Sequence, residues 1–130
     1  MRREIVIHSL DQARAALAAA AACDKEVTLA SAPGAGLQAG SGWFKSVIEQ
    51  ACEAYPQVSV TAILDCGDQP GAAMAALRVG LNNLRFHGPV ELREKLAGMG
   101  AVLVPPADTS LDLREIQGPE TACAAFLREA

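Results

Sequence analysis

The chain has 130 residues, a net charge of −4 and a hydrophobic fraction of 51%, which together suit one domain with its own core. Aromatic residues make up only 4% of the chain and no basic stripe is present, so nucleic-acid binding is not expected. No apolar run has membrane-spanning length, and the Ala-rich stretch 15–22 lacks the layout of a signal peptide. We therefore expect a cytoplasmic protein that has no membrane partner.

The four cysteines are Cys23, Cys52, Cys66 and Cys123, no two of which form a C-x-x-C pair. Only two histidines accompany them. Structural zinc sites draw their ligands from closely spaced Cys and His residues. We therefore expect free thiols and no metal site, and the pattern leaves the cofactor unknown.

The first predicted strand covers residues 4–8, with an apolar centre. Ser9 and Gln12 form a capping box, the pattern that begins a helix. His8 ends the strand, so we expect it at the carboxyl edge of the sheet. There it is either a satisfied polar residue or a catalytic group.

A second strand is predicted over residues 26–30, and the loop 31–42 that follows is the most glycine-rich part of the chain. Gly34, Gly36 and Ala39 fit G-x-G-x-x-A, a variant of the dinucleotide-binding fingerprint. The glycines that follow would weaken a helix inside the motif, so dinucleotide binding is not expected.

The loop that begins at Ser31 has two remaining interpretations. The simpler one is a flexible connector that ends at Ser41, where a helix over residues 43–55 begins. In the other, backbone N–H groups of the loop cradle a phosphate or a carboxylate.

Residues 58–71 form the centre of the predicted fold. Residues 58–64 have the composition of a strand that is covered on both faces. Gly67 permits a tight turn, and Asp68 is expected to cap the next helix, whose first turn contains Pro70.

Asp65 and Cys66 follow this strand directly, at the edge where ligands bind in open α/β sheets. A helix N-terminus there favours anions and lowers the pKa of a nearby thiol. The simpler interpretation is that Asp65 ends the strand, Cys66 fills space and Asp68 only caps the helix.

Residues 82–87 alternate between polar and apolar side chains, which favours an edge strand or one that meets another subunit. His87 ends this strand. The helix after Pro89 is expected to bury Leu92, Leu96 and Met99 and to expose Glu91, Arg93, Glu94 and Lys95. A fifth strand is predicted over residues 101–104, an extended piece over 111–116 and a last helix over 119–128.

Alternating strands and helices predict an α/β fold with parallel strands and right-handed crossovers. We expect one three-layer domain over residues 1–130, with βα repeats in 1–106 and a tail with a C-terminal helix in 107–130. About five mainly parallel strands fit a Rossmann-like or flavodoxin-like sheet as well as half of a barrel.

Two stretches of the sequence resemble segments of known protein classes. Residues 75–88 look like a repeat unit of a (β/α) barrel, in which a helix ends at Gly before the next strand. Residues 64–71, Leu-Asp-Cys-Gly-Asp-Gln-Pro-Gly, resemble small bacterial α/β proteins of unknown function. That resemblance implies no activity and assigns no functional residue.

Three functions remain open. The first is a binding domain for a small anionic or phosphorylated ligand, held by Ser31, Gly34, Gly36, Gly67 and Asp68. The second is a homo-oligomeric interaction protein, with a homodimer as the simplest form, based on the fourth strand, Trp43 and the tail. The third is an enzyme that uses Asp65 or Cys66 with His8 or His87.

Overall fold

The computed structural model describes residues 2–129 and alternates strands with helices. The strands are β1 (Arg3–Ile7), β2 (Val27–Ser31), β3 (Val60–Asp65), β4 (Asn83–Arg85), β5 (Val102–Leu103) and β6 (Thr109–Asp112). The helices are α1 (Leu10–Cys23), α2 (Ala35–Gln38), α3 (Ser41–Ala54), α4 (Pro70–Arg78), α5 (Val90–Gly98) and α6 (Pro119–Arg128). The strands form a parallel sheet in the order β5-β4-β3-β2-β1-β6, which confirms the α/β class.

Contacts within the chain cluster in two units. Unit 1 comprises Met1–Ala30, Val47–Ala62 and Ala107–Ala130, and unit 2 comprises Ser31–Ser46 and Ile63–Pro106. The organisation of the chain as one domain stays a prediction. None of the helices within residues 2–129 is long and apolar enough to cross a membrane.

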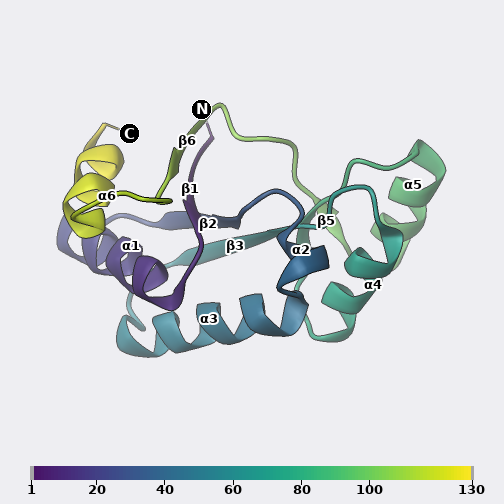
Figure 1. Cartoon of the computed structure of the whole chain (residues 1–130), viewed down its shortest axis with the longest axis horizontal. Coiled ribbons are helices and arrows are strands. Elements are labelled where there is room, and N and C mark those ends of the chain that lie inside the picture. Colours follow the sequence, from purple (N-terminus) through teal and green to yellow (C-terminus); the bar gives the residue numbers. More distant parts are fainter. Residues whose placement is uncertain (1, 130) are drawn as a thin grey trace. The chain divides into compact units, whose positions relative to one another are not determined.

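In unit 1, the tail packs back on the first βα repeat. Strand β6 pairs with β1 in parallel, with Ile5 opposite Leu111, and α6 lies beside α1 (Figure 1). The Arg3 guanidinium stacks on the Phe126 ring at 4.0 Å and donates a 2.7 Å hydrogen bond to its carbonyl. Stacking and hydrogen bonding together fix α6 to the amino end of β1. The sequence placed the extended piece two residues too late.

The predicted cap of α1 is confirmed, with one change. The Ser9 hydroxyl accepts a hydrogen bond from the Gln12 N–H at 3.2 Å. The Gln12 side chain accepts from the N–H of His8, rather than from the N–H of Ser9 as in a standard capping box. Gln12 also donates to the carbonyl of Leu113, so the start of α1 is tied to the chain after β6.

In unit 2, β3, β4 and β5 pair in parallel, and α4 and α5 lie next to each other (Figure 1). The fourth strand is therefore not an edge strand, since β5 lies outside it. Leu84 is fully buried and Arg85 is 8% exposed. The alternation in the sequence reflects a buried arginine, whose hydrogen bonds make its burial tolerable, rather than an open face.

Three further expectations are wrong. Asp68 does not cap α4: the N-cap is Gln69, and among the described residues the exposed Asp68 carboxylate accepts a hydrogen bond only from the Gln69 side chain. Met99 is half-exposed, because α5 ends before it and it lies outside the buried face. The amino-terminal half of β3 is only partly buried, so the strand is covered fully only over residues 63–65.

Candidate functional site

The Asp65 carboxylate organises the carboxyl end of β3 in unit 2. Its Oδ1 accepts hydrogen bonds from the backbone N–H of Gly34 at 3.1 Å and of Gly67 at 2.9 Å. The Asp65 N–H donates to the Ser31 hydroxyl at 2.9 Å. The side chain is almost fully buried. One carboxylate thus ties the glycine-rich loop to the turn after β3, which brings four of the predicted site residues together.

Two glycines make this arrangement sterically feasible. Gly67 has φ of 58°, a conformation that costs side-chain-bearing residues energy. A Cβ at Gly36 would lie 3.1 Å from the carbonyl oxygen of Asp65 and 3.5 Å from Sγ of Cys66. The loop includes α2, a four-residue helix that the sequence did not predict, and α2 covers this turn. The predicted flexible connector is therefore partly helical.

Cys66 lies in this turn with no exposed surface. Burial and the neighbouring Asp65 charge raise the pKa of its thiol to about 11. A nucleophilic cysteine needs the opposite environment, one that stabilises the thiolate. The surroundings of Cys66 therefore favour a packing role over a catalytic one.

His87 joins the same turn from the end of β4. The backbone N–H of His87 donates to the Gly67 carbonyl at 2.7 Å, and Nε2 of its ring lies 3.7 Å from Oδ2 of Asp65. The imidazole is half-exposed, whereas the carboxylate is buried. The structure thus places His87 beside Asp65, as the sequence predicted, and their catalytic role stays a prediction.

His8 belongs to unit 1 and has a different partner. Its Nε2 lies 2.6 Å from Oδ1 of Asp112, at the end of β6. Partial burial raises the pKa of the Asp112 carboxyl, but the N–H of Arg114 and the His8 ring outweigh it and lower the pKa overall. A catalytic role for His8 with Asp65 stays a prediction. Within residues 2–129, no group of three Cys, His or acidic residues is placed to hold a metal ion.

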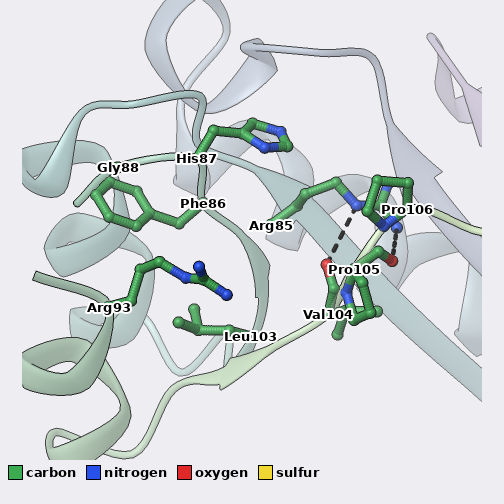
Figure 2. A pocket seen from close by; sticks show the side chains of 9 residues that line it. All are labelled: Arg85, Phe86, His87, Gly88, Arg93, Leu103, Val104, Pro105 and Pro106. Atoms are coloured by element: carbon green, nitrogen blue, oxygen red, sulfur yellow. Dashed lines mark hydrogen bonds between the residues drawn. The ribbon is translucent and has the colours of Figure 1, made fainter. Parts of the chain in front are cut away.

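A pocket of about 550 Å³ opens at the carboxyl ends of β4 and β5, within unit 2 (Figure 2). Its polar side chains are all basic and come from β4, from the residues just after it and from α5. Its other residues are a glycine and five apolar residues. The lining consists of Arg85, Phe86, His87, Gly88, Arg93, Leu103, Val104, Pro105 and Pro106.

Arg85 fixes one wall of the pocket. Its Nε donates to the Val104 carbonyl at 3.3 Å and its guanidinium donates to the Pro105 carbonyl at 3.1 Å. Both bonds are drawn in Figure 2. They hold the segment after β5 against the end of β4.

Arg93 contributes the second arginine. It lies in the first half of α5, is exposed, and extends toward Leu103 (Figure 2). Within residues 2–129, its side chain makes no ion pair or hydrogen bond. No acidic residue lines the pocket among the described residues. The pocket is therefore electrostatically suited to an anion.

Neither arginine was predicted as a site residue. Arg93 was expected on the exposed face of its helix, and Arg85 belongs to the stretch 82–87, which was expected to form an edge strand or to meet another subunit. One signal was present: both follow the pattern of a basic residue near the carboxyl end of a strand or early in the next helix. That pattern is too common on solvated surfaces to single out a site.

No protein-family model matches the chain. It is 29% identical over 85 residues to a fructose-bisphosphate aldolase of Xanthobacter flavus, covering 65% of this chain and 24% of that protein. It is also 29% identical over 89 residues to the fructose-bisphosphate aldolase of a Nostoc strain, covering 68% and 25%. A Cereibacter sphaeroides protein, fructose-bisphosphate aldolase 1, is 31% identical over 85 residues, covering 65% and 23%. The chain thus spans about a quarter of the length of these curated relatives.

Proposed function

We propose that the protein binds a small phosphorylated ligand in the pocket at the carboxyl ends of β4 and β5. Arg93 and His87 would contact the phosphate, and Arg85 would hold the opposite wall. The observation that carries the proposal is a pocket of about 550 Å³ whose polar lining residues are all basic. That volume falls within the range of roughly 300–1,000 Å³ common for small-molecule sites.

The chemistry of the arginine supports a phosphate. A guanidinium can donate two parallel hydrogen bonds to phosphate oxygens, and such charge-assisted bonds are stronger than neutral ones. Arg93 is exposed and makes no ion pair within the described residues, so no internal salt bridge would have to break.

The relatives support a phosphorylated ligand over other anions. The names of all three contain fructose-bisphosphate, so the similarity connects this chain with proteins named for a phosphorylated substrate. Because the chain spans about a quarter of their length, we do not extend the aldolase reaction to it.

The predicted glycine-loop site is a competing location for the same ligand. The N–H groups of Gly34 and Gly67 already donate to Asp65, so an anion there would have to displace a carboxylate. Asp68 is a further negative charge on that turn. For this reason we place the ligand in the basic pocket.

Titration with inorganic phosphate, followed by phosphorus NMR, tests the proposal. Arg93→Ala is expected to weaken binding about tenfold or more, since hydrogen bonds to charged groups contribute roughly 1.5–3 kcal/mol. Lys95→Ala removes the same charge from the same helix but outside the pocket lining, so it should change affinity little. Absence of binding, or equal losses in the two variants, would overturn the proposal.

A second candidate is self-association, which one observation favours. Strand β5 is an edge strand of the sheet, and Val102 on it is 56% exposed. Exposed apolar edge strands tend to pair with other chains. Sedimentation velocity would test this candidate: a dimer that Val102→Lys converts to monomer supports it, and a strictly monomeric wild-type protein contradicts it.

A further inference from the structure

We infer that the ligand of this pocket joins its anionic group to an apolar body, rather than to a polyhydroxylated chain. This inference rests on the proposed function and specifies the chemical class of its ligand. It follows from the pocket wall opposite Arg93, and from the kind of hydrogen-bonding groups that the lining contains.

The wall opposite Arg93 is apolar and accessible. Leu103 and Val104 are partly exposed, and Pro105 and Pro106 are exposed. Figure 2 shows these residues on β5 and the segment after it, across the pocket from α5. A hydrocarbon or aromatic group of the ligand would therefore remove apolar surface from water on both sides of the contact.

The backbone of this wall has few free hydrogen-bonding groups. Pro105 and Pro106 have no N–H, and the Val104 N–H donates to the Leu84 carbonyl at 2.8 Å. The carbonyls of Val104 and Pro105 accept from Arg85. Hydroxyl groups placed against this wall would lose water without gaining equivalent partners.

The side chains of the lining are also poor partners for hydroxyl groups. Each hydroxyl needs an acceptor for its proton, and the guanidinium groups of Arg85 and Arg93 only donate. Among the described lining residues, only the His87 side chain can accept, and only when neutral. The lining side chains thus provide several donors for an anion but only one acceptor for hydroxyl protons, which disfavours sugar phosphates.

Three probes test this inference: inorganic phosphate, glycerol 3-phosphate and phenyl phosphate. Inorganic phosphate has no organic group, glycerol 3-phosphate carries two hydroxyls and phenyl phosphate carries an aromatic ring. We expect phenyl phosphate to bind about tenfold more tightly than the other two, because its ring covers the apolar wall. Glycerol 3-phosphate should bind no better than inorganic phosphate.

Val104→Thr adds a direct check at the wall, since threonine nearly preserves the shape and β-propensity of valine but adds a hydroxyl. We expect it to weaken the binding of phenyl phosphate several-fold, by a clearly larger factor than it weakens the binding of inorganic phosphate. If glycerol 3-phosphate binds as tightly as phenyl phosphate, the inference is overturned while the proposed function stands. If none of the three probes binds, both are overturned.

Discussion

Nε2 of the half-exposed His87 lies 3.7 Å from Oδ2 of the buried Asp65 carboxylate, while Oδ1 of the same carboxylate accepts two backbone hydrogen bonds. His87 also lines the basic pocket. Asp65 thus connects the glycine-rich loop, the turn after β3 and one pocket residue. Its removal should affect the fold first and ligand binding only through His87.

Asp65→Ala should lower the free energy of unfolding by roughly 1–3 kcal/mol, because the N–H groups of Gly34 and Gly67 lose their acceptor. Asp68→Ala is the matched control, since Asp68 is exposed and, within residues 2–129, hydrogen-bonds only to the Gln69 side chain. Its effect should stay within about 0.5 kcal/mol. Urea unfolding of both variants checks this prediction, and equal losses would contradict it.

Gly88→Ala should destabilise unit 2 by roughly 1–3 kcal/mol, because a Cβ at this position would overlap the buried Phe86 ring. Gly71→Ala is the control, since a Cβ there meets no atom within 4 Å and lies in α4. It should be neutral or stabilising by up to about 1 kcal/mol. Thermal unfolding compares them, and a neutral Gly88→Ala would show that the ring can move aside.

Cys66 should react with iodoacetamide more slowly than the half-buried Cys23 at neutral pH. Burial, together with the Asp65 charge, raises the Cys66 pKa to about 11, so its thiolate fraction is very small. The rate at Cys66 should rise with pH until about pH 11, whereas denaturation should equalise the two cysteines. Peptide mass spectrometry measures both rates. Faster alkylation at Cys66 than at Cys23 would instead indicate an activated nucleophile.

Asp112→Asn should make the protein less sensitive to acid. Burial raises the pKa of the Asp112 carboxyl, but the Arg114 N–H and His8 lower it by more, so the folded protein binds this proton less readily than the unfolded chain. The resulting stability is present above the unfolded pKa of about 3.9 and is lost as pH falls through the lower folded value. Unfolding free energies from about pH 5 to about pH 2 check this, with Asp11→Asn as the control. Parallel pH profiles for wild type and Asp112→Asn would contradict it.

Much of the fold could be predicted from the sequence because its signals are local. The Ser9 cap, the apolar periodicity of the helix that begins at Ser41, and the glycine after α4 each specify their element directly. The predictions were wrong where contacts between distant parts of the chain determine whether a residue is buried. The alternating pattern predicts an exposed Arg85, whereas hydrogen bonds to carbonyls in the segment after β5 make its burial tolerable.

The candidate site could be predicted only in part. The carboxyl ends of β3 and β4 placed Asp65 and His87 close together, as parallel strands require. The roles of individual side chains depend on their positions in the folded structure, which the spacing of residues in the sequence does not specify. Asp68 has the residue type of a cap but lies one position too early, and Cys66 has the type of a nucleophile but is buried.

Nitrogen–proton NMR correlation spectra recorded during a titration with inorganic phosphate would show whether an anion binds beside Arg93 and His87. We expect saturable shifts at the amides of His87, Gly88 and Arg93, with much smaller shifts in residues 34–40. Shifts confined to residues 34–40, or no saturable shift at all, would contradict it.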